Sequence, residues 1–471
     1  MRFLALSVTI YSGEKNNSTG LAPASPARIR LLPNPQTAPS PNPKKACHLP
    51  KSIFCLMSSL AIASLLAGCG GSSGGHSTGG GGSTPTVVTY TFTGATPVAV
   101  ATQIGSGAYT QAALNSGTLT LSIPHGETKF SVAYLCPAST GSTTPQNFEF
   151  FNQATIADGT SYSAYCFTPH TSTTITAPVQ VNAEAFPNAE YVIVSGVYLP
   201  WTNAIMDFDA NLEPGSQDVP IYVLKDFNSI DDYLAIKILR GQQGPGALNS
   251  GLPVVLGPND KVTYQPISYQ NIPAGYGVLS PFVEYETTAG ASITLDVDGS
   301  PNQYLAMPSG AYQNGDYYLF ISAAGPAGNQ NPGDGNLAEV ETLTSTGGPQ
   351  NVSFPAPWPF SNPTASDLPT FDFSYSGFSG MSNVLNYASF YWYPSKTSFN
   401  EISISATANY LNGSTSLTVP DLSAQSGFLS QKGFSGTVNW TTEVVQSNLS
   451  GAKPTNGTVQ YVTHTGTYTL P

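Results

Sequence analysis

Apolar and polar residues alternate along most of the chain from Thr86 onward. The alternation is clear over residues 118–123, 130–136 and 162–166, where every second side chain is apolar. Successive side chains of a β-strand point to opposite faces, so this period of two predicts strands with one buried face. Cys136 and Cys166 both fall on the apolar faces.

Further along, the pattern changes in detail but still favours strands. Residues 191–194 and 317–321 are apolar runs expected of buried strands, and residues 402–410 alternate again. Asn412-Gly413 then precedes a second alternating segment, which predicts a β-hairpin. Residues 230–239 could form a helix, although their β-branched side chains leave that open.

This pattern predicts an all-β protein of tandem immunoglobulin-like β-sandwich modules. The 46 Gly and 39 Pro residues divide the chain into short strands, as sandwiches require. We place one sandwich at residues 86–177, a β-rich middle region of one or two modules at 178–348, and a C-terminal sandwich at 349–471.

The N-terminal part has a different composition. Residues 1–43 are rich in Pro, Ser and Asn, which predicts a disordered or wrongly assigned extension. Residues 44–68 begin with lysines and continue into an apolar run that is too short to span a bilayer, as expected of a signal peptide. Residues 69–85 are a Gly/Ser-rich tether.

The apolar run ends in Leu66-Ala67-Gly68-Cys69, which resembles the lipobox of bacterial lipoproteins. That resemblance implies cleavage before Cys69 and lipidation of its thiol. Gly70 after the cysteine resembles lipoproteins that are sorted to an outer membrane. The alternative is an ordinary secretory signal in which the cysteine is there by chance.

Cleavage at this point would change the cysteine count and the charge. Three of the 5 Cys residues would remain, and with Cys69 lipidated, Cys136 and Cys166 form one pair in an oxidising compartment. The mature chain would carry 8 basic and 26 acidic residues, a net charge of −18. Nucleic acids and anionic membrane surfaces select basic patches, so neither is an expected partner.

One acidic segment has oxygen-bearing side chains at alternate positions, as in a calcium loop. The candidate ligands are Asp207, Asp209, Asn211, Glu213 and Asp218. Calcium takes six to eight hard oxygen ligands, and it is the one cofactor that the sequence suggests. The segment lacks the glycine of an EF-hand loop and lies among strands, so a solvated acidic loop is the alternative.

No catalytic constellation emerges from the sequence. Gly75–Gly79 matches the G-x-S-x-G pattern of lipases, but it lies in the Gly/Ser tether with no strand before it or helix after it. Paired carboxylates at Asp231-Asp232 and at Glu284 and Glu286 could serve glycoside hydrolysis only if they shared a cleft. We therefore predict no catalytic residues.

Aromatic clusters are the remaining candidates for binding. Residues 390–393 are Phe-Tyr-Trp-Tyr, and Trp358 lies in a second cluster. Alternation in a strand would place Tyr391 and Tyr393 on one face, and their hydroxyl groups tolerate water better than the other two rings do. Exposed aromatic rings stack on sugars; the alternative is that the whole cluster fills a core.

These features predict an exported, lipid-anchored cell-envelope protein of a bacterium, held at the outer membrane or cell surface, with a structural or adhesive role and no catalysis. The alternatives are a glycan-binding surface lipoprotein and, after it, a glycan-active enzyme. The expected partners are the membrane, through the lipid anchor, and polysaccharide or other envelope proteins.

Overall fold

The computed structural model describes residues 84–139, 146–166, 175–194, 197–212, 217–225, 233–242, 252–279, 281–295, 300–326, 337–356, 362–364, 368–372, 383–395, 398–429, 434, 436–448 and 456–470. The predicted extension, signal peptide and lipidation site lie outside these residues. Within them the protein is almost entirely strand, in several packed sheets, which confirms the predicted all-β sandwich class. No helix in the described ranges is long and apolar enough to cross a membrane.

The first sandwich follows directly from the alternation in the sequence. In β4, Leu119, Leu121 and Ile123 are buried while the residues between them face outward. Their sheet, in the order β4-β1-β7, packs on β2, β5 and β6 around one apolar core. The strands of this sandwich are β1 (Thr86–Gly94), β2 (Ala99–Ile104), β3 (Thr110–Gln111), β4 (Thr118–Ile123), β5 (Lys129–Ser139), β6 (Gln146–Thr155) and β7 (Ser161–Cys166).

The next unit packs a four-stranded sheet, β10-β9-β12-β13, on a three-stranded sheet, β11-β8-β14, around its own core. Its strands are β8 (Ile175–Asn182), β9 (Tyr191–Val194), β10 (Val197–Pro200), β11 (Met206–Leu212), β12 (Gln217–Leu224), β13 (Tyr233–Gln242) and β14 (Val254–Val255). Residues 233–239 of the segment left open between helix and strand belong to β13, which pairs with β12 along its length. The boundary predicted at residue 177 falls inside β8.

A third unit packs β19-β15-β22 on one end of a much longer sheet, around a core rich in tyrosine. Its elements are β15 (Thr263–Gln270), β16 (Tyr276–Val278), β17 (Phe282–Glu286), β18 (Ser292–Thr294), β19 (Gln303–Ala306), β20 (Tyr317–Pro326), β21 (Leu337–Thr344) and β22 (Gln350–Ser353), with 3-10 turns η4 (Pro258–Asp260) and η5 (Ser309–Ala311).

The C-terminal strands extend that long sheet, and a short layer covers one of its faces. The elements are β23 (Thr370–Asp372), β24 (Asn383–Ser395), β25 (Ser398–Thr407), α3 (Ala408–Leu411), β26 (Ser416–Thr418), β27 (Thr437–Ser447) and β28 (Gly457–Thr469). Apolar side chains of β24, β25 and β27 pack against Phe371, Leu417 and Phe428 of the covering layer.

The hairpin predicted at Asn412-Gly413 is wrong. The Thr407 hydroxyl accepts a hydrogen bond from the Tyr410 N–H and so caps a short helix, α3, at its start. Asn412 then takes the left-handed conformation that ends this helix, with φ of 50°. As a result β26 pairs with β23 and not with β25.

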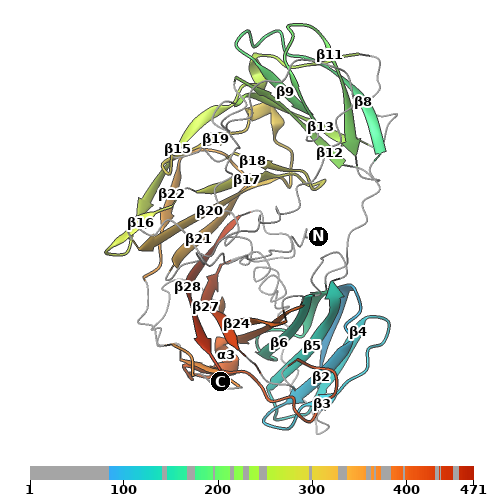
Figure 1. The fold of residues 1–471 in the computed structure, drawn as a ribbon, viewed down its shortest axis with the longest axis vertical. Coiled ribbons are helices and arrows are strands. Elements are labelled where there is room, and N and C mark those ends of the chain that lie inside the picture. Colours follow the sequence, from blue (N-terminus) through green and yellow to red (C-terminus); the bar gives the residue numbers. More distant parts are fainter. Residues whose placement is uncertain are drawn as a thin grey trace, which may run out of the picture.

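The long sheet has 13 strands and joins the first sandwich to the C-terminal strands (Figure 1). Its order is β18-β17-β20-β21-β28-β27-β24-β25-β6-β5-β2-β3, with β16 beside β20. The joint is the parallel pairing of β25 with β6, from Phe399 opposite Gln146 to Ala406 opposite Gln153. One core continues across it, because buried residues of β2, β5 and β6 share a cluster with those of β24, β25 and β27.

Candidate functional site

The Cys136–Cys166 disulfide is present, as the sequence predicts. It joins β5 to β7, and therefore the two sheets of the first sandwich, with a Cα–Cα distance of 5.3 Å. Both cysteines are buried, which matches their place on the apolar strand faces.

The candidate calcium ligands lie in two different sheets. Asp207 and Asp209 are exposed on β11, where Asp207 Oδ1 accepts a hydrogen bond from Gln180 Nε2 at 3.0 Å. Asn211 also belongs to β11, Glu213 lies outside the described residues, and Asp218 is buried on β12. Among the described residues no three His, Cys, Asp or Glu side chains come together as a metal site. Calcium binding by this segment stays a prediction.

Asp218 instead belongs to a buried ionic cluster. Arg240 Nη1 donates to Asp218 Oδ2 at 2.8 Å, and Arg240 Nη2 donates to Asp316 Oδ2 at 2.6 Å. Asp316 also accepts from the Tyr285 hydroxyl at 2.6 Å and from the Thr288 N–H at 2.9 Å. Because Asp218 and Arg240 belong to the second unit and Asp316 to the third, this cluster ties the two units together.

The electrostatics of this cluster follow from its hydrogen bonds. Burial alone would raise the pKa of Asp316, but the hydrogen bonds from Tyr285 and Arg240 outweigh it and lower the pKa below its ordinary value. Burial likewise opposes the charged form of Arg240, and its two carboxylate partners outweigh burial and raise the pKa of the guanidinium. The two ion pairs of Arg240, one to Asp218 and one to Asp316, make the cluster a structural clamp.

The aromatic strand β24 has the two faces that alternation predicts. Phe390 and Trp392 are buried in the core beneath the covering layer. Tyr391 is half-buried on the opposite face, and Tyr393 is 47% exposed. Trp392 is therefore a core residue and the two tyrosines face outward, as the sequence predicts for this cluster. Trp358 lies outside the described residues.

Two further aromatic side chains complete a cluster on this outward face. Phe399 of β25 contacts both tyrosines, with its ring centroid 5.7 Å from that of Tyr391 and 5.5 Å from that of Tyr393. Phe148 of β6 follows, with its ring centroid 5.9 Å from that of Phe399. We call Phe148, Tyr391, Tyr393 and Phe399 the aromatic patch; Tyr393 is exposed and the other three are half-buried.

The rings of the patch are not coplanar. The planes of Tyr391 and Phe399 differ by 31°, whereas Tyr393 stands at 89° to Tyr391. The patch therefore offers one ring face beside one ring edge, in a bent arrangement. Such a surface can bind a ligand with a single ring more readily than it can bind a flat, extended ligand.

A carboxyl group lies beside the patch. Glu401 is directly opposite Tyr391 in the β24–β25 ladder, and its Oε1 accepts a hydrogen bond from the Ser403 hydroxyl at 3.3 Å. Burial raises the pKa of Glu401 to about 7, although the hydrogen bonds from Ser403 and Ser389 act against this. At neutral pH this carboxyl group can therefore both donate and accept hydrogen bonds.

The carboxylate pair at Glu284 and Glu286 lies on one face of β17. Burial and the neighbouring Glu286 raise the pKa of Glu284 to about 7, and burial raises that of Glu286 as well. The two carboxyl groups thus belong to the same strand, β17. They do not face each other across a cleft from two separate elements. Asp231 and Asp232 lie outside the described residues.

Sequence reasoning missed Phe148 and Phe399 as members of the patch. Phe148 is one of three phenylalanines in β6 and Phe399 is the one phenylalanine in β25, and neither has a local sign of a surface role. Phe399 meets Tyr391 and Tyr393 because β25 pairs with the neighbouring strand β24. Phe148 joins them only because β6 and β25, which are distant in sequence, pair in parallel.

Comparisons with known proteins do not assign this chain to a family. No protein-family model matches the chain, and no curated protein matches its sequence. Among solved structures, the chicken CNTN1 FN1-FN3 domains match at 10% identity over 81% of this chain and 96% of that one, with a TM-score of 0.11. At that TM-score the match carries no argument about the arrangement or role of this protein.

Proposed function

We propose that the protein is an exported, lipid-anchored, non-catalytic cell-envelope protein of a bacterium with an adhesive role. The signal-like segment, the lipobox-like Leu66–Cys69 sequence and the Gly/Ser tether support the anchor. The tether of residues 69–85 would give the folded part a mean reach of roughly 20–25 Å from the lipid surface. The expected site of attachment is the outer membrane or the cell surface.

The aromatic patch is the observation that best supports the proposed adhesive role. It lies on the long sheet where the first sandwich meets the C-terminal strands, and it is built from three strands of that sheet. Solvated aromatic side chains that group together on a sheet are costly unless a partner covers them. The continuous ladder and shared core hold them in a fixed arrangement, which lowers the entropy lost on binding.

We further propose that the ligand of the patch is a glycan. A sugar ring has an apolar face that stacks on an aromatic ring, and its hydroxyl groups suit a tyrosine hydroxyl and a carboxyl group at the margin. Tyr391, Tyr393 and Glu401 supply these groups side by side. The bent arrangement of the rings favours a soluble, twisted polysaccharide over a flat crystalline surface.

The anchor is tested by replacing Cys69 with Ala in a bacterial host and separating membrane from soluble fractions with detergent. We expect the wild-type protein in the detergent phase and the variant in the aqueous phase. Replacement of Ser73, within the same tether, is a matched control that should leave partition unchanged. A Cys69→Ala protein that still partitions into detergent would refute the anchor.

A further inference from the structure

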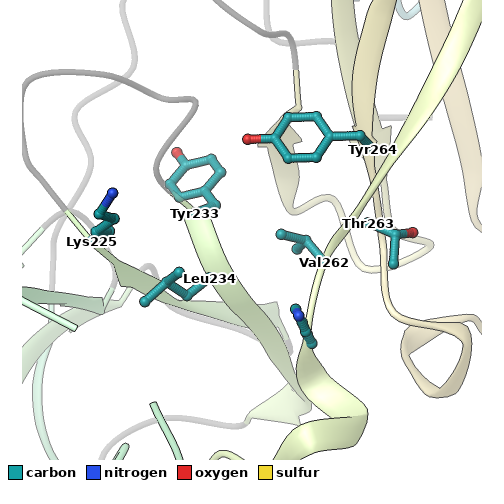
Figure 2. A pocket seen from close by; sticks show the side chains of 7 residues that line it. Lys225, Tyr233, Leu234, Val262, Thr263 and Tyr264 are labelled. Carbon is teal, nitrogen blue, oxygen red and sulfur yellow. The ribbon is translucent and has the colours of Figure 1, made fainter. Parts of the chain in front are cut away.

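An open cavity of about 490 Å³ lies where the second and third units meet (Figure 2). One wall comes from the residue just after β12 and from the start of β13, and the other from residues at and just before the start of β15. Its lining residues are Lys225, Tyr233, Leu234, Lys261, Val262, Thr263 and Tyr264. None of them belongs to the aromatic patch.

The walls of the cavity are fixed by backbone and ring contacts. Lys261 bridges to Ala235, and the Val262 N–H donates to the Leu234 carbonyl at 3.3 Å. The Tyr233 ring stacks on Tyr222, with centroids 5.3 Å apart and planes 24° apart. The cavity therefore keeps its shape without a ligand, which favours binding.

The distribution of positive charge singles out this cavity. Five described residues are Lys or Arg, and three of them have partners: Lys129 lies over the Tyr410 ring, Lys237 pairs with Asp260, and Arg240 pairs with Asp218 and Asp316. The other two, Lys225 and Lys261, are exposed and form no ion pair within the described part of the chain. Both line the cavity.

Aromatic and apolar groups accompany the two lysines. Tyr264 is 52% exposed, and Figure 2 shows its ring projecting over the cavity towards Tyr233. Val262 and Leu234 lie below the rings. Ammonium groups bind carboxylate or sulfate oxygens with charge-assisted hydrogen bonds, and tyrosine rings stack on the apolar face of a sugar.

We propose that this cavity binds an anionic sugar unit, whose negative charge is a carboxylate or a sulfate ester. Lys225 and Lys261 hold the anionic group, and Tyr264 and Tyr233 contact the ring. The whole chain has a net charge of −12, so it repels long polyanions and the cavity takes a single acidic unit, such as a chain end. This site is independent of the lipid anchor and of the aromatic patch.

The test measures binding of small sugars to the full-length chain in detergent by saturation-transfer NMR and calorimetry. The probes are glucuronate, glucose 6-sulfate, uncharged glucose and acetate. We expect an acidic sugar to bind, glucose and acetate to bind at least roughly fivefold more weakly, and added salt to weaken binding. Binding of glucuronate alone assigns a uronic acid, and binding of glucose 6-sulfate alone assigns a sulfated sugar.

Variants locate the site. Lys225→Gln and Lys261→Gln should each weaken binding roughly fivefold, and Lys261→Arg should retain it. Lys129→Gln, outside the cavity, is the matched control and should bind as the wild type does. Because both cavity lysines are exposed, the variants should melt with the wild type. Failure of both acidic sugars to bind, equal binding of glucose, or wild-type binding by Lys225→Gln/Lys261→Gln overturns the proposal without bearing on the aromatic patch.

Discussion

Phe148 and Phe399 lie with their ring centroids 5.9 Å apart, although they come from strands that are far apart in the sequence. Their contact follows from the parallel pairing of β6 with β25. Phe148 also packs against the core of the first sandwich. Its contact with Phe399 therefore links that core to the outward-facing tyrosines of β24. The same joint makes the sheet continuous and assembles the proposed binding patch.

The disulfide should stabilise the first sandwich. Replacing Cys136 and Cys166 together by Ala should lower the free energy of unfolding by about 3.5 kcal/mol, because the bond closes a loop with a sequence separation of 30. Urea unfolding of both proteins measures the difference. Thiol titration of the unreduced protein should find neither cysteine free, and reduction should bring the wild type down to the stability of the variant. Equal stabilities would contradict this assignment.

The ion pairs of the Arg240 clamp should contribute more to the free energy of unfolding than an exposed ion pair does. Arg240→Met leaves Asp218 and Asp316 buried without their cation, which should cost about 3–5 kcal/mol at pH 7. Lys237→Met, which breaks the more exposed pair with Asp260, is the control and should cost less than about 1 kcal/mol. Similar losses for the two variants would argue against a structural role for the clamp.

The same clamp has a defined dependence on pH. The pKa of Asp316 is lowered in the folded protein, so its contribution is present above the ordinary value of 3.8 and is lost as pH falls through the folded value. The stability difference between wild type and Arg240→Met should therefore persist from pH 7 to pH 5 and shrink below pH 3.8. A difference that grows on acidification would have the wrong sign.

A carboxyl group with the opposite shift is Glu443 of β27. It is 3% exposed, and burial raises its pKa to about 7 in spite of a hydrogen bond from the Thr463 hydroxyl at 3.3 Å. Folding therefore favours its neutral form, and that stability is present below pH 4.5 and lost as pH rises to about 7. Glu443→Gln should be more stable than wild type by about 3 kcal/mol at pH 8 and equal to it near pH 4. Melting curves at the two pH values measure this; a variant less stable at pH 8 would contradict it.

The features that the sequence predicts correctly depend on local periodicity. Alternation alone places Cys136 and Cys166 on buried faces and separates Trp392 from Tyr391 and Tyr393. Each of these inferences needs only the fact that neighbouring residues of a strand face opposite ways.

The features that the sequence does not predict depend on pairing between distant segments. Nothing near residues 146–155 indicates a partner at 398–407, so neither the continuous sheet nor the complete patch could be foreseen. Residues 233–239 become a strand because β12 supplies hydrogen-bonding partners. Asn412-Gly413 ends a helix because the Thr407 side chain provides the cap, which outweighs the hairpin tendency of that dipeptide.

Polysaccharide binding by Tyr391→Ala/Tyr393→Ala tests the central claim, that the aromatic patch is the adhesive contact, most directly. Affinity electrophoresis against a panel of soluble neutral polysaccharides should show retardation of the wild type, and the double variant should bind about tenfold more weakly, a loss of roughly 1.4 kcal/mol. Its melting temperature should stay close to that of the wild type because neither tyrosine is fully buried. Trp392→Ala, at a buried position, should instead destabilise the fold by about 3–5 kcal/mol. Wild-type binding by the double variant, or no binding by the wild type to any of the panel, would contradict the claim.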